Sequence, residues 1–245
     1  MIEKLHLIEQ LPQEEELHAL DELYPDYYDL FSGVSDKVAL ETIQLMCGLD
    51  KKHKGTSLHS LNVSVVSFRL AKDLSTWLNI GDPYLVARAG LLHDIGKFYI
   101  DRELLDADGD EHKIWKIYHP DLGKDVVEKF DFICAEIIQK HHTFQKKSYP
   151  EQSIWDGDNE LLVSSALISV ADQVISPQEG RGYISRRSTA VEAVKSARGN
   201  LIVIPEILRD ILTGYANEVY TEVQCKIKNP RFSRTFTALP LASSV

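Results

Sequence analysis

The sequence predicts an all-α fold, and three observations support this prediction. Apolar residues recur at the three- and four-residue spacing of a helix face, and prolines and glycines separate the periodic segments. Alternation typical of a strand occurs only over residues 201–204, which are too few to build a sheet. A chain of 245 residues with 44% hydrophobic content is long enough to bury one large core.

The first half of the chain is predicted to contain a small cap followed by three longer helices. Residues 1–31 are acidic and helix-prone, and two prolines divide them, so residues 1–34 are predicted to form a helical cap. The alternative for this segment is a contact with a partner or a second copy of the chain. Longer helices are predicted over residues 35–49, 57–78 and 84–93. The third is apolar almost all round, which is typical of a buried central helix.

The second half is predicted to contain five helices and a tail. One helix is predicted to begin at Pro120, because proline disfavours α geometry in the preceding residue and suits a first turn. Further helices are predicted over residues 130–139, 161–175, 190–197 and 204–220. Polar or glycine-bearing loops are predicted over residues 101–111, 143–159 and 176–187. The main domain is therefore predicted to span residues 35–222, with a C-terminal tail over residues 223–245.

Charge and cysteine content exclude several classes of protein. A net charge of −10 argues against binding of a nucleic-acid polymer, which needs a basic face. Cys47, Cys134 and Cys225 are widely spaced, so neither a disulfide framework nor a zinc knuckle is predicted. No signal peptide is visible, and no apolar stretch approaches the roughly 20 residues that span a bilayer. These features predict a cytoplasmic protein without a membrane segment.

Seven imidazole and carboxylate side chains lie in or at the ends of the predicted helices. They are His59, His93, Asp94, His119, His141, His142 and Asp172. An ionised carboxylate on an apolar helix costs several kcal/mol unless a cation or a hydrogen-bond network offsets it. Asp94 and Asp172 both have this problem, and a bound metal would solve it for both. The sequence therefore predicts that the seven side chains are metal ligands.

The number and type of ligands predict two divalent ions. Seven ligands exceed what one ion normally takes from a protein, so two ions sharing a bridging carboxylate are expected. Asp94 lies in the middle of the set and is the predicted bridge. Imidazole and carboxylate without thiolate suit Fe, Mn, Zn, Ni or Co and do not choose between them.

The order of these residues resembles the HD superfamily of metal-dependent phosphohydrolases. The matching segments are residues 59–63, 93–97, 119–123, 141–142 and 171–172. The three later histidines make the chain similar to the HD-GYP subgroup, which comprises cyclic di-GMP phosphodiesterases with two or three metals. The similarity covers roughly residues 40–220 and includes Arg181-Gly182-Tyr183. The resemblance implies an HD-domain helical bundle, here with a helical N-terminal extension.

Three segments depart from the subgroup's pattern. Thr143 follows the histidine pair where the subgroup has glutamate, and residues 146–150 replace its glycine-containing loop. Gly55 stands where members with three metals use a glutamate. The departures favour two ions over three and alter the loop that is implicated in recognising substrate and partner.

The resemblance implies a phosphoric ester hydrolase whose binuclear centre activates water against a nucleotide phosphodiester, with cyclic di-GMP the leading substrate. Asp94 and Lys97 are the predicted catalytic residues. Lys97 and Arg181 are the predicted substrate contacts, since a cation can neutralise a phosphoryl oxygen and arginine can hold one bidentately. The alternative for both is an ordinary surface cation.

A second function from a different class remains open at this point. A metal-containing HD fold could act without catalysis, as a nucleotide sensor or as an interaction module that contacts a signalling protein through the altered loop. Retention of all seven ligands favours the hydrolase, because a site kept only for binding need not keep every ligand.

Overall fold

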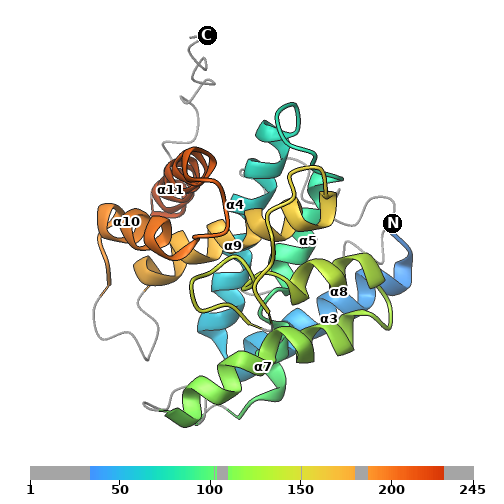
Figure 1. Cartoon of the computed structure of the whole chain (residues 1–245). Helices are drawn as coiled ribbons and strands as arrows, with labels where there is room; N and C mark the ends of the chain where they lie inside the picture. Colours follow the sequence, from blue (N-terminus) through green and yellow to red (C-terminus); the bar gives the residue numbers. More distant parts are fainter. Residues whose placement is uncertain (1–33, 102, 104–109, 150, 180–186, 229–245) are drawn as a thin grey trace.

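The computed structural model describes residues 34–101, 103, 110–149, 151–179 and 187–228 (Figure 1). Within this part of the chain the elements are α3 (Asp36–Lys52), α4 (Lys54–Leu74), α5 (Pro83–Leu92), the 3-10 helix η2 (Ile95–Tyr99), α7 (Asp110–Val127), α8 (Phe132–Gln139), α9 (Glu160–Glu179), α10 (Ala190–Asn200) and α11 (Glu206–Lys228). No strand occurs among these residues, which confirms the predicted all-α class. The predicted cap, the tail beyond residue 228 and Arg181 lie outside the described residues.

The fold is built around α4 and α9, which pack against each other in the middle of the molecule (Figure 1). α3, α5 and α11 also pack on α4, and α10 and α11 pack on α9. α4 is buried along most of its length, and its serine, alanine and valine residues allow neighbouring helices to come close. One close approach is at Gly90 of α5, where a Cβ would lie 3.0 Å from the Cα of Ser64. α5 therefore lies directly on α4.

Local capping explains where several helices begin. The Ser35 side chain accepts a hydrogen bond from the Val38 N–H at the start of α3. Asp82 caps α5 in the same way, with Pro83 in the first turn. Asp131 caps α8 through the N–H of Cys134. These caps fix where α3, α5 and α8 begin.

Three predicted boundaries are wrong, and one of them is the end of α9, which runs to Glu179 through residues 176–179 that were predicted to lie in a loop. α7 begins at Asp110, and Pro120 lies inside it, so His119 is in the middle of a helix and not at its start. The packing of α7 against η2 and α8 outweighs the local preference that proline imposes on the residue before it. α11 runs to Lys228, through residues that were predicted to belong to the tail. None of the helices in the described part of the chain is long and apolar enough to cross a membrane.

Candidate metal centre

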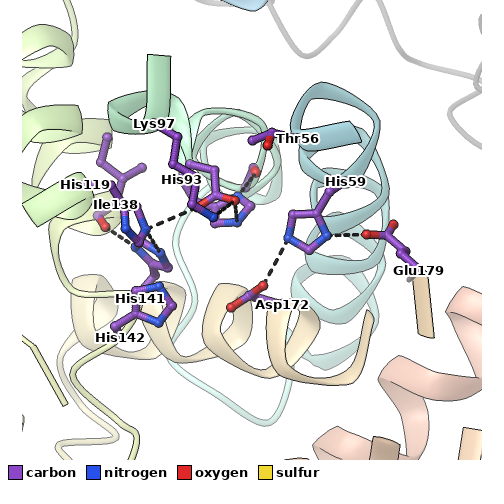
Figure 2. Close-up of polar contacts among 12 residues, drawn as sticks. Thr56, His59, His93, Lys97, His119, Ile138, His141, His142, Asp172 and Glu179 are labelled. Carbon is purple, nitrogen blue, oxygen red and sulfur yellow. Dashed lines mark hydrogen bonds and ion pairs between the residues drawn. The ribbon is translucent and has the colours of Figure 1, made fainter. Parts of the chain in front are cut away.

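The seven predicted ligands gather in one buried place between α4, α7, α9 and the ends of α5 and α8, and Figure 2 labels all of them except Asp94. Each of the seven residues is at most 7% exposed. They come from positions between residues 59 and 172, so the fold and not the local sequence brings them together. The structure thus places every predicted ligand in a single site.

The break between α5 and η2 directs His93 and Asp94 into the site. α5 ends at Leu92, and Asp94 begins the tighter turn of η2. His93 Nδ1 lies 2.8 Å from the Gly90 carbonyl, which can only accept, so Nδ1 carries the proton. Nε2 then keeps its lone pair. This nitrogen is buried and has no hydrogen-bond partner, as expected for an atom that faces a cation.

His141 has the same arrangement at the end of α8. Its Nδ1 lies 2.5 Å from the Ile138 carbonyl, and its Nε2 lies 3.3 Å from Nε2 of His119. His119 Nε2 is also 3.2 Å from Oδ1 of Asp94. Ring nitrogens that face each other beside a carboxylate form a natural cation site, because imidazole lone pairs and carboxylates are ligands of divalent metals.

Three overlapping groups of ligand atoms have the spacing of metal sites. The groups are His59, His93 and Asp172; His93, Asp94 and His141; and His119, His141 and His142. Within each group the ligand atoms lie within 4.8 Å of one another. His93 belongs to the first two groups and His141 to the last two. Asp94 is in the middle group, which is consistent with the bridging role predicted for it.

Burial sets the protonation states that metal binding requires. Burial lowers the pKa of His93, His119 and His141 to about 4, because it penalises the imidazolium form, so all three are neutral at pH 7. Burial alone would raise the pKa of Asp94, but the Lys97 ammonium and the two nearest histidines hold it well below its usual value. Neutral imidazoles and ionised carboxylates are the forms that bind divalent ions.

The pKa values of Asp172 and His142 are lowered as well. Burial would raise the pKa of Asp172, but the hydrogen bond and charge of His59 lower it well below the usual value. Burial lowers the pKa of His142, and the neighbouring His141 lowers it further. The site therefore presents neutral imidazoles at His93, His119, His141 and His142 beside two anionic carboxylates.

Lys97 lies inside the site and is not a surface cation. The residue is 7% exposed, and its ammonium donates to Asp94 Oδ2 at 2.6 Å. This contact offsets the negative charge of the buried carboxylate. It also places a cation beside the predicted bridging ligand, as a contact with a phosphoryl oxygen would require.

Two glycines bring His119 close to the motif of His93 and Asp94. A Cβ on Gly96 would lie 1.9 Å from the His119 carbonyl oxygen and 2.8 Å from the Gly123 nitrogen. η2 and α7 can therefore approach this closely only because residue 96 has no side chain. The spacing between these elements fixes where His119 enters the site.

Three residues that the sequence reasoning missed contact the ligands. Glu179 Oε2 lies 2.6 Å from His59 Nδ1, and the Gln145 amide nitrogen lies 2.6 Å from His142 Nδ1. The Tyr149 ring lies against His142, with ring centroids 4.5 Å apart. Glu179 was missed because residues 176–187 were predicted to form a loop, whereas α9 runs to Glu179 and places it on the same helix face as Asp172.

A known family model and a known protein are similar to parts of this chain. The family model described as HD domain matches residues 56–175, a range that contains all seven predicted ligands. Ribonuclease Y of Aquifex aeolicus (strain VF5) is 31% identical over 144 residues, which are 58% of this chain and 22% of that protein. The chain thus spans about a fifth of the length of that relative.

One solved structure is similar to the chain over most of its length. It is the L. monocytogenes phosphodiesterase PgpH HD domain in complex with cyclic-di-AMP. The TM-score is 0.46 and the sequence identity 16%, and the match covers 80% of this chain and 100% of that one.

Proposed function

We propose that this chain, whose residues 56–175 match the HD domain family model, is a metal-dependent hydrolase of nucleotide phosphodiesters. The observation that carries the proposal is the buried set of seven donors, in which His93 Nε2 has a lone pair and no hydrogen-bond partner. A purely structural helical core gives no reason for such an atom or for two buried carboxylates.

The ligand groups divide between two proposed ions. His59, His93 and Asp172 would hold one ion, His119, His141 and His142 would hold the other, and Asp94 would bridge them. Divalent ions such as Fe, Mn, Zn, Ni or Co supply Lewis acidity and lower the pKa of water in sites of this kind. The protein's contribution is to keep the imidazoles neutral and their ring orientations fixed.

Lys97 is the residue proposed to contact the substrate's phosphoryl group. Its ammonium already points into the site, where it donates to Asp94. A phosphoryl oxygen beside Asp94 would come within reach of the same ammonium, which would neutralise charge that develops during hydrolysis. His142 and Asp172 are the most exposed of the seven ligands, so we propose that the substrate approaches on their side.

The proposed substrate is a small nucleotide with a phosphodiester bond, and a cyclic dinucleotide such as cyclic di-GMP is the leading candidate. The similarity to a ribonuclease supports phosphodiester chemistry. A net charge of −10 disfavours a long RNA, because polymer binding depends on a basic surface. Resemblance to the HD-GYP subgroup supports the cyclic dinucleotide.

Metal analysis combined with hydrolysis assays tests this proposal. Purified protein should contain about two ions and hydrolyse bis-p-nitrophenyl phosphate and at least one member of a nucleotide panel, and Asp94→Ala should abolish hydrolysis. Asp125→Ala is a matched control, because Asp125 is exposed on α7. Fewer than one bound ion would overturn the metal centre. Bound ions with hydrolysis no faster than in Asp94→Ala would favour a nucleotide sensor without catalysis.

A further inference from the structure

His59 lies between two carboxylates, and only one of them belongs to the predicted ligand set. Its Nε2 is 3.0 Å from Asp172 Oδ1, and its Nδ1 is 2.6 Å from Glu179 Oε2 (Figure 2). The His59 side chain is fully buried, and that of Glu179 is 14% exposed. Glu179 thus contacts a proposed ligand from the side that faces away from the proposed ion.

The Glu179 carboxylate is itself held in place. Its second oxygen, Oε1, accepts a hydrogen bond of 2.7 Å from the Asn62 amide. His59 and Asn62 are three residues apart on α4, and Asp172 and Glu179 are seven residues apart on α9, so each pair shares a face of its helix. The packing of α4 on α9 therefore brings ligand and supporting residues together from both helices.

We propose that Glu179 is a positioning residue that fixes the tautomer and ring orientation of His59 for metal binding. The inference rests on the proposed function, because it concerns one of the two proposed ions. An ionised carboxylate can only accept, so it keeps a proton on Nδ1 and leaves Nε2 to face Asp172 and an ion. Carboxylates that accept from a ligating histidine also raise its basicity, and losing one typically costs about 10–100-fold in metal affinity.

A purely structural tie between α4 and α9 would give a different result. Glu179 contacts His59 and Asn62, whereas the second proposed ion is held by His119, His141 and His142. A positioning role therefore predicts weaker binding of one ion and unchanged binding of the other. A structural role predicts a less stable fold, with both ions affected together.

Titration of the metal-free protein with Co²⁺ separates these outcomes. Glu179→Ala should weaken one of two Co²⁺ ions by about 10–100-fold and change the visible absorption of that ion alone. Glu179→Gln keeps the length but can accept through only one atom, so it should lose less affinity than Glu179→Ala. Asn62→Ala should have a smaller effect on the same ion, because the Glu179 contact with His59 remains.

The control is Glu128→Gln, since Glu128 is exposed in the turn after α7. Thermal melting of each metal-free variant reports on the fold independently of metal. Unchanged Co²⁺ affinities in Glu179→Ala would overturn the inference, as would equal losses at both ions together with a lower melting temperature. Wild-type protein that binds no Co²⁺ would overturn the proposed function as well, and this outcome is distinct from the other two.

Discussion

Gly96 offers a sharp test of how the fold positions the site. A Cβ at this residue would lie 1.9 Å from the His119 carbonyl oxygen and 2.8 Å from the Gly123 nitrogen. All of these are backbone atoms, so no flexible side chain can move aside. To restore even a 3.0 Å contact in Gly96→Ala, η2 and α7 must separate by about 1.1 Å.

That separation acts directly on the ligands. His119 Nε2 is 3.2 Å from Asp94 Oδ1 and 3.3 Å from His141 Nε2, and a shift of α7 changes both distances. Overpacking typically costs about 1–3 kcal/mol, so the free energy of unfolding of Gly96→Ala should fall by about this amount. A displacement of about 1 Å in a catalytic site can reduce activity about 100-fold, and hydrolysis should fall on that scale.

Urea denaturation and hydrolysis of bis-p-nitrophenyl phosphate measure the two effects. Gly199→Ala is the matched control, because nothing lies within 4 Å of a Cβ added at this exposed residue of α10. That substitution should stabilise the protein by about 0.5–1 kcal/mol, since alanine loses less entropy than glycine in a helix. If Gly96→Ala unfolds at the same urea concentration as the wild type and hydrolyses the substrate as fast, the close approach does not position His119 and the reasoning is refuted.

Two further predictions concern stability. Arg88 and Asp131 form a buried ion pair at 2.8 Å between α5 and the start of α8. Arg88→Met should therefore lower the free energy of unfolding in urea by about 3–5 kcal/mol. A loss below about 1 kcal/mol, which is the value of a surface ion pair, would contradict this prediction. Because the pKa values of His93, His119 and His141 are about 4 in the folded protein and near 6.5 when unfolded, the unfolded chain binds more protons between these values. The free energy of unfolding of metal-free protein, measured with urea, should therefore be highest above about pH 6.5 and fall towards pH 4, by up to about 1.4 kcal/mol per pH unit for each histidine. A flat profile would show that these histidines titrate normally.

The sequence identifies the side chains that gather in the site because their chemistry conflicts with their surroundings. A charged residue such as Asp94 or Asp172 on an apolar helix is expensive, and this conflict is visible without coordinates. Lys97 was predicted to contact a phosphoryl oxygen, and the structure adds that its ammonium contacts Asp94, three residues before it. The helices themselves follow from apolar periodicity, and most of their positions agree with the structure to within a few residues.

Contacts that depend on tertiary packing could not be predicted in the same way. The start of α7 was placed at Pro120 because proline acts locally, whereas the packing of α7 on η2 and α8 acts at a distance. Glu179 and Asn62 are separated by 117 positions in the sequence and meet only because α4 crosses α9. Neither residue conflicts with its local environment, so nothing in the sequence marks it. Supporting residues around a site are therefore harder to find than the ligands they hold.

The contacts of the two buried carboxylates explain how one site can be compatible with folding and with metal binding. Asp94 is offset by Lys97 at one oxygen and by His119 at the other, and Asp172 is offset by His59. Each of these partners is a cation or a histidine, and a divalent ion can replace the contact that a histidine makes with the carboxylate. The carboxylates are thus never buried without compensation, even in the absence of metal. Lys97 differs from the histidines because it cannot ligate a metal while it is protonated, so a bound ion would leave its ammonium available for a substrate's phosphoryl oxygen.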